Sequence, residues 1–223
     1  MIKQIIFIVD ALRFIQGGKI LTWRTPFLAI QYLIKIASER LGSLRAAGLK
    51  PITPENKGVF SFRLAGHIDD VQKAQRVYLE AFEDDYGAFL LEKLYKQFPQ
   101  LFFITMNGDE MVGYCVYTMD PGIFTQERKA CLYSIAIDSH YQGQGHARYM
   151  IEKTMAYLRQ NSISSVYLHV RPENTKAIKL YESLGFKLGK VVKGINPKRS
   201  MMLLMETNLD GKFDALKETV TPQ

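Results

Sequence analysis

The clearest hydrophobic pattern in the chain is a short apolar run followed by a polar turn and an amphipathic stretch. Residues 131–137 have the length and β-prone composition of a buried strand, and Asp138-Ser139 ends it. Apolar residues then recur at intervals of three and four, at Ala147, Met150, Ile151, Met155 and Leu158. The pattern predicts a strand, a turn and a helix that begins inside the turn.

The remaining apolar pattern predicts one α/β domain. Strands are expected at residues 59–64, 101–106, 111–119, 165–170, 186–192 and 201–205, and helices at 69–82 and 174–184. Asn107-Gly108 predicts a hairpin between two of these strands, and Gly185 is a typical helix stop. Because the central unit runs strand, helix, strand, we expect one parallel pair in a largely antiparallel sheet.

Two apolar segments precede this domain. Residues 2–15 end at Gly17-Gly18, and a second helix begins at Thr25-Pro26 and continues to about Leu41, with Gly42 or Gly48 as its stop. Charges interrupt both segments, so neither a membrane span nor a cleaved signal peptide is expected. Two interpretations stay open for residues 1–50. One is packing on the core or on a second copy in a homodimer, and the other is a basic surface that contacts an anionic membrane.

These segments suggest three regions. Residues 51–58 have the composition of a linker. We therefore expect a helical extension and linker at 1–57, a catalytic domain at 58–206 and a polar tail at 207–223. A chain of 223 residues is long enough for one substantial core.

The net charge of +7 suggests a nucleic-acid partner until its distribution is considered. Residues 1–57 carry nine Lys and Arg against three acidic residues, and these charges are dispersed. The remainder of the chain therefore has a net charge of only +1, and no nucleic-acid partner is expected. The acidic run Glu83-Asp84-Asp85 either forms a solvated face or attracts a cationic acceptor.

Cysteine and histidine usage also limits the function. Cys115 and Cys131 both lie in strand-like runs, so we expect buried, reduced thiols and a cytoplasmic protein. His140 and His146 are six residues apart, which is not a convincing metal-ligand spacing, and no metal is expected.

The turn at residues 142–147 is a candidate anion site. The first turn of a helix has backbone N–H groups without internal partners, beside the positive end of the helix dipole. Gly143 and Gly145 let a bulky phosphate approach, because they have no Cβ atom. A Walker loop requires Lys-Ser/Thr where His146-Ala147 stand, and a dinucleotide fingerprint requires a small residue in place of Arg148. Neither motif fits.

Two motifs about 30 residues apart carry a family resemblance. The turn has the pattern Gln/Arg-x-x-Gly-x-Gly/Ala at Gln142, Gly145 and Ala147. A second signature has Asn, Ala, Leu-Tyr and Gly-Phe at fixed offsets, matched at Asn174, Ala177, Tyr181, Gly185 and Phe186. Together they resemble the GNAT superfamily of N-acetyltransferases, and are most similar to the protein N-terminal acetyltransferases of the ribosomal-protein alanine type. The resemblance covers about residues 59–206.

The resemblance implies the GNAT fold, with helices flanking the sheet, and acetyl-CoA as co-substrate. In the family this turn holds the pyrophosphate of coenzyme A, which assigns cofactor binding to Gln142, Gly143, Gln144, Gly145, His146 and Ala147. The amide arm of the cofactor is expected beside the strand residues Ile135, Ala136 and Ile137, at a splay in the sheet. Asn174 either bonds the same arm or caps its helix. Gln142 stands where Arg is commoner, so backbone donors must carry more of the phosphate binding.

The resemblance also implies the chemistry, which is acetyl transfer to a primary amine by direct attack in a ternary complex. Tyr181 stands at the position of the general acid, because a phenol of pKa about 10 stays protonated while a thiolate of pKa about 8.5 forms. His169 stands where the family has a Glu or His that helps to remove the amine proton. The alternatives are a packing tyrosine and a structural histidine.

The acceptor is the least determined part of this prediction. A peptide N-terminus is favoured by the motif resemblance, over a small amine or a lysine. The competing class is a non-catalytic acyl-CoA-binding or membrane-associated module, which the unusual N-terminal segment suggests.

Overall fold

The computed structural model describes residues 24–82, 85–121, 127–193 and 201–210. In chain order the elements are α2 (Arg24–Ala47), β1 (Glu55–Lys57), β2 (Phe60–Leu64), α3 (Ile68–Ala81), α4 (Asp85–Gln97), η1 (Pro99–Leu101), β3 (Phe102–Asn107), β4 (Glu110–Met119), β5 (Lys129–Ile137), η2 (Ser139–Tyr141), α5 (His146–Gln160), β6 (Ser165–Val170), α6 (Thr175–Ser183), β7 (Lys187–Lys193) and β8 (Met201–Asn208). The chain divides into two compact units, Met1–Arg40 and Leu41–Gln223. The second unit contains the sheet and every predicted site residue.

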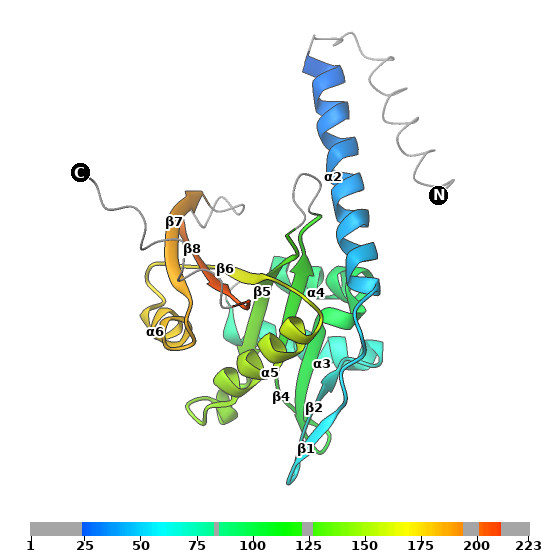
Figure 1. Ribbon diagram of the computed structural model, residues 1–223. Coiled ribbons are helices and arrows are strands. Elements are labelled where there is room, and N and C mark those ends of the chain that lie inside the picture. The colour runs from blue at the N-terminus through cyan, green and yellow to red at the C-terminus, as the bar shows by residue number, and fades with distance from the viewer. Residues whose placement is uncertain (1–23, 83–84, 122–126, 194–200, 211–223) are drawn as a thin grey trace, which may run out of the picture. The chain divides into compact units, whose positions relative to one another are not determined.

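The described part of the second unit is built on an eight-stranded sheet with the order β1-β2-β3-β4-β5-β6-β8-β7. Neighbouring strands are antiparallel except for β5 and β6, which are parallel. Helix α5 joins β5 to β6 and covers one face of the sheet, whereas α3 and α4 cover the other (Figure 1). The predicted fold class is confirmed.

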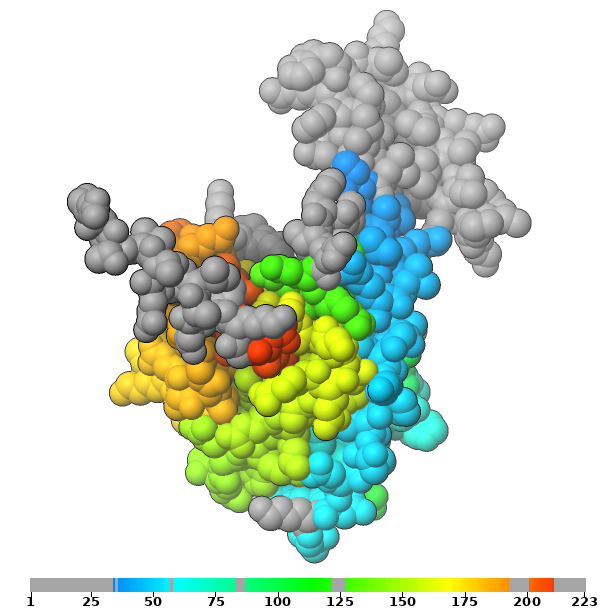
Figure 2. Space-filling model, in the orientation of Figure 1, coloured from blue at the N-terminus to red at the C-terminus, as the bar shows by residue number. Residues whose placement is uncertain are grey.

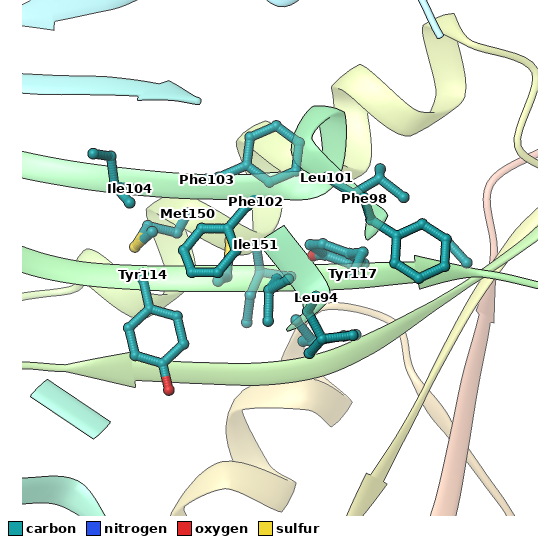
Figure 3. Close-up of a cluster of buried hydrophobic side chains, with 14 of the residues drawn as sticks. Leu94, Phe98, Leu101, Phe102, Phe103, Ile104, Tyr114, Tyr117, Met150 and Ile151 are labelled. Carbon is teal, nitrogen blue, oxygen red and sulfur yellow. The ribbon is translucent and has the colours of Figure 1, made fainter. Parts of the chain in front are cut away.

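Aromatic side chains of β3 pack against helices on both faces of the sheet, and Figure 3 labels two of them, Phe102 and Phe103. Phe103 of β3 meets Tyr157 of α5 at a centroid distance of 5.4 Å. Its neighbour Phe102 meets Tyr95 of α4 edge-on at 6.0 Å. Because successive residues of a strand point to opposite faces, one short strand holds both helical layers. Such ring pairs contribute about 0.5–1.5 kcal/mol beyond their burial.

The central strand, turn and helix are observed as predicted. Strand β5 ends at Ile137, and α5 begins at His146, inside the glycine turn. The predicted hairpin is also confirmed, since Asn107 pairs with Glu110 at the end of β3 and β4. Gly108 between them has a φ of 56°, a conformation that favours glycine.

The linker and the tail are both shorter than predicted. Within the expected linker, Glu55–Lys57 form β1 and pair with β2. These three polar residues show no hydrophobic alternation, so the sequence pattern did not predict this edge strand. At the other end, β8 continues to Asn208, and Thr207 is buried where it pairs with Val166 of β6.

Helix α2 ends at Ala47, so Gly48, the second of the two expected stops, follows it. Gly42 lies inside the helix, and a Cβ atom there would stand 2.5 Å from the carbonyl oxygen of Met119. Gly42 is therefore required by a close approach to the end of β4. In the described residues no helix has the length and apolar character needed to cross a membrane.

Two predicted features fall outside the described residues. One is the apolar segment at residues 2–15. The other is most of the acidic run, because Glu83 and Asp84 are not described and only the backbone of Asp85 is, at the start of α4. The interpretations of residues 1–50 and of the acidic run stay predictions.

Candidate active site

The parallel pair at the centre of the sheet is incomplete. Strands β5 and β6 pair from Lys129↔Ser165 to Leu132↔Leu168, and the described ladder ends there. Strand β5 nevertheless stays paired with β4 as far as Ile137. The second half of β5 therefore has an edge that β6 does not cover, and the sheet has a gap at this point.

The three residues predicted to hold the cofactor's amide arm lie along this gap. The N–H of Asp138 donates to the carbonyl oxygen of Val112 on β4, at 3.0 Å. Because backbone groups alternate in direction along a strand, the N–H of Ala136 also faces β4, whereas those of Ile135 and Ile137 face the gap. The backbones of Ile135 and Ile137 are thus the ones that can extend the sheet.

A β-bulge marks the beginning of the gap. The register between β4 and β5 shifts between Val116 and Tyr117, where β5 has the extra residue Tyr133. The side chain of Tyr133 is 45% exposed, although the strand before it is buried. The sequence pattern did not single out Tyr133, because it lies within an apolar run. The sequence signal that could have revealed Tyr133 is its size and its polar hydroxyl, which distinguish it from the smaller residues around it.

The glycine turn joins the gap to the start of α5. Gly143 and Gly145 have φ angles of 78° and 86°, which favour glycine. A Cβ atom added at either residue would have no neighbour within 4 Å, so both face open space. The first-turn N–H groups, including those of His146 and the half-buried Ala147, have no helical carbonyl to bond. With the helix dipole, they form an anion site.

The polar side chains of the turn are bonded to the protein itself. The side-chain amide of Gln142 donates to the carbonyl oxygen of Ile137 at 3.0 Å, and that of Gln144 donates to a carbonyl oxygen four residues earlier at 3.0 Å. The ring of His146 packs on Phe60 of β2, with centroids 5.1 Å apart. Backbone groups are therefore what the turn presents to an anion.

Tyr181 of α6 lies near Cys115 of β4, whose side chain contacts Thr154 of α5, so Tyr181 is on the face of the sheet that α5 covers. Its ring is buried against Phe186, with centroids 5.7 Å apart. Burial and, to a smaller extent, the nearby Cys115 raise the pKa of Tyr181 to about 12, so the phenol stays protonated. On the same face the hydroxyl of Tyr117 bonds Thr154 at 2.6 Å. Among the described residues, the Tyr181 hydroxyl has no such partner.

His169 of β6 lies on the other face of the sheet. Tyr117 faces α5, so Thr118 faces away, and register places Cys131 of β5 and Tyr167 of β6 on that same far face. His169, two residues further along β6, shares it, with its ring edge-on to Tyr167 at 5.9 Å. Partial burial lowers the pKa of His169, so the imidazole is neutral at pH 7. The two predicted catalytic residues therefore lie on opposite faces of the sheet.

Comparison with known families identifies this arrangement. Residues 68–186 match the model of the acetyltransferase (GNAT) family. The chain belongs to the GNAT acetyltransferase family. The predicted GNAT fold and acetyltransferase class are confirmed, and the matched range contains the gap, the glycine turn, Tyr181 and His169.

The similar proteins include enzymes that acetylate protein N-termini by name. An N-alpha-acetyltransferase of Saccharolobus solfataricus is 28% identical over 142 residues, which are 60% of this chain and 84% of that protein. The ribosomal protein bS18-alanine N-acetyltransferase of Escherichia coli is 34% identical over 88 residues, 40% of this chain and about half, 53%, of that protein. A chain in the crystal structure of the NatC complex bound to Gag peptide and CoA has a TM-score of 0.61 at 17% identity. That alignment covers 67% of this chain and 98% of the other, and it supports the fold.

Asn174 has an observed structural role in this GNAT domain. Its side-chain oxygen accepts a hydrogen bond from the N–H of Ala177 at 3.1 Å, which makes Asn174 the N-cap of α6. The capping interpretation is thus observed. Binding of the cofactor by Asn174 stays a prediction.

The two cysteines of the GNAT domain are buried and free, as expected. Burial raises the pKa of Cys131 to about 12 and the pKa of Cys115 well above its usual range. Both thiols are therefore protonated and are unsuited to nucleophilic catalysis. Within the described ranges, no group of three His, Cys, Asp or Glu side chains is placed to hold a metal ion.

Proposed function

We propose that this GNAT enzyme transfers the acetyl group of acetyl-CoA to the α-amino group of a peptide. The observation that carries the proposal is the gap between β5 and β6. It adjoins the glycine turn, and Tyr181 and His169 lie on opposite faces of the sheet. The activities of the similar archaeal and E. coli proteins favour an N-terminal amine over a lysine or a polyamine. The CoA and peptide in the NatC complex agree with this pair of substrates.

In this proposal the chain holds acetyl-CoA mainly through its backbone. The N–H groups of Gly143, Gly145 and the first turn of α5 bind the pyrophosphate. Ile135 exchanges hydrogen bonds with the amide arm and the N–H of Ile137 donates to it, as though the arm were another strand beside β5. The thioester then lies near the bulge, where the gap between β5 and β6 begins.

The peptide amine attacks the thioester carbon from the side of His169, which forms the C–N bond and a tetrahedral oxyanion. Neutral His169 accepts the proton that the amine loses, directly or through water. Collapse of the oxyanion breaks the C–S bond. Tyr181 donates its hydroxyl proton to the leaving thiolate, and its pKa of about 12 keeps that hydroxyl protonated until this step. His169 then releases its proton to solvent and Tyr181 regains one from solvent, which restores the enzyme, and the products are the N-acetyl peptide and CoA.

A thiol-release assay with three acceptors tests the proposal. The first is a lysine-free peptide with a free N-terminus, the second is an N-blocked peptide with one internal lysine, and the third is spermidine. We expect thiol release with the first acceptor only. Equal rates with the N-blocked peptide would reassign the acceptor to lysine. Binding of acetyl-CoA without release to any acceptor would favour a non-catalytic module.

A further inference from the structure

Ordering the glycine turn costs conformational entropy. Gly143 and Gly145 both have positive φ angles, and glycine loses more conformational freedom on ordering than any other residue. A loop that holds its binding shape for only a fraction of the time binds more weakly by that fraction. Whatever fixes this turn therefore contributes to cofactor affinity without touching the cofactor.

Tyr141 ties the start of the turn to the tip of a hairpin. It is the last residue of η2, two positions before Gly143. Its hydroxyl donates to a carboxylate oxygen of Glu110 at 2.7 Å and accepts from the side-chain amide of Asn107 at 3.1 Å. Asn107 and Glu110 are the register pair that closes the β3–β4 hairpin. Both residues at the end of the hairpin thus converge on one hydroxyl.

The rings around Tyr141 link the turn to β2 as well. Phe60 meets Tyr141 at a centroid distance of 6.4 Å and His146 at 5.1 Å. Tyr141 and His146 meet each other edge-on at 6.1 Å. Because Tyr141 precedes the glycines and His146 follows them, these contacts hold both ends of the turn. Phe60 lies outside the residues that match the family model.

A third contact lies further along α5. Glu55 of β1 forms an ion pair with Lys153 at 2.5 Å, and Figure 2 shows the first strands beside α5 on the surface. Both side chains are more than a third exposed, so this pair contributes little energy. We therefore assign the main effect to Tyr141.

We propose that Tyr141 and Glu110 are positioning residues for acetyl-CoA, acting through the glycine turn. This inference rests on the proposed role of the turn in holding the pyrophosphate. The hydroxyl–carboxylate bond keeps the start of the turn against the β3–β4 hairpin. Its loss lowers the fraction of molecules in which the amides converge on an anion, and leaves the residues at the gap unchanged.

The first test removes only the hydroxyl. Tyr141→Phe keeps the ring packed on Phe60, so the aromatic contacts survive. We expect the Kd for CoA, measured by calorimetry, to rise about 3- to 10-fold, the range of one hydrogen bond. At saturating acetyl-CoA, kcat should stay within about two-fold, because the bond acts on binding rather than on the chemical step.

A matched pair of hairpin variants isolates the bond. Glu110→Ala should raise the Kd as Tyr141→Phe does, and the double variant should bind no more weakly than the weaker single variant. Asp109→Ala removes the same charge from the same hairpin, but Asp109 contributes its backbone carbonyl to Lys73. It should leave the Kd unchanged.

The outcomes separate this inference from the proposed function. Failure of the unmodified protein to bind CoA would overturn the proposed function. Normal CoA binding with an unchanged Kd in Tyr141→Phe would overturn this inference alone. It is also overturned if Asp109→Ala has the same effect as Glu110→Ala, or if kcat and Tm fall together with affinity, since that would be a general loss of structure.

Discussion

The two halves of β5 belong to one strand but differ in what covers their second edge. Residues 129–132 are bonded to β4 on one side and to β6 on the other, and Ala130 and Leu132 are buried. Residues 133–137 are paired with β4 but not with β6, and the first of them is the exposed Tyr133. The first half contributes to the core and the second half offers a backbone edge to a ligand. The candidate site thus arises where a ladder ends, without any added domain or insertion.

Two features explain why the ladder ends. The bulge at Tyr133 bends β5, because one strand has an extra residue that its partner lacks. Strand β6 continues beyond Leu168, where His169 and Val170 keep the pairing with β8 on its other edge but are not paired with β5. Pro172 then follows, and it has no N–H to extend a ladder.

The largest effect on the functional half is expected from Tyr181→Phe. The change removes the proposed proton donor at the gap but leaves the ring against Phe186. We expect kcat to fall about 10³-fold, within the usual range for loss of an acid catalyst, while CoA binds as before. Steady-state kinetics and calorimetry measure the two quantities.

Tyr157→Phe is the matched control for this variant. Tyr157 is also buried, and burial raises its pKa to about 12, but it lies on α5 with its hydroxyl directed to the carbonyl oxygen of Gln100. Its kcat should stay close to that of the unmodified enzyme. A comparable loss in both variants would show that a buried hydroxyl matters only for packing.

Substitutions in the paired half of β5 and β6 should lower the stability of the protein rather than its activity. Leu168 stands at the last β5–β6 register pair and is 1% exposed. Leu168→Ala should lower the free energy of unfolding by about 3 kcal/mol, measured by urea denaturation, because it removes apolar contacts and leaves a cavity. The KM for acetyl-CoA should change little in the folded fraction. Leu188→Ala on β7, where the side chain is 59% exposed, should cost almost nothing.

The sequence was informative wherever hydrophobic periodicity and glycine chemistry agreed. Strand β6 was predicted at its observed bounds, and the start of α5 was predicted from Gly143, Gly145 and the apolar positions after them. Asn174 was recognised both as a cap and as a motif residue, and its capping bond is observed. In each case the feature depends on a few residues that are adjacent in the sequence, so the sequence alone predicts it.

The missed features depend on partners distant in the sequence. Strand β1 has no apolar pattern that would reveal it, and its pairing is with the backbone of β2. Tyr133 is exposed because the register shifts against β4, which a single strand cannot reveal. The link between Tyr141 and Glu110 joins residues 31 positions apart. No periodicity signals a contact of that kind.

A smaller effect is expected where the functional half of β5 meets the turn. Gly145→Ala puts a Cβ atom into open space at a φ of 86°, where an alanine is strained by about 1–2 kcal/mol. We expect the KM for acetyl-CoA to rise about 30-fold, because the strained turn loses its shape and the methyl group faces the proposed phosphate. Kinetics at a fixed, saturating peptide concentration measure it.

Gly58→Ala separates backbone strain from loss of the site. Gly58 has a φ of 63° and also has no neighbour within 4 Å of an added Cβ atom, but it lies between β1 and β2. Both variants should lose similar thermal stability. Only Gly145→Ala should raise the KM, and an equal rise in Gly58→Ala would argue against the turn as the phosphate site.

The smallest effect, about tenfold on kcat/KM at pH 8, is expected from His169→Gln, because water can accept the amine proton in its place.

The pH profile of this variant is more informative than its rate. A peptide α-amine has a pKa of about 8, so log kcat/KM should rise with a slope of one as pH approaches 8. Burial lowers the pKa of His169 below 6.5, and below that pKa the imidazole gains a proton and can no longer act as a base. The unmodified enzyme should therefore show a slope of two at its acid end, and His169→Gln a slope of one throughout. A slope of two that survives the substitution would assign the second proton to another group and leave His169 as a structural residue of the gap.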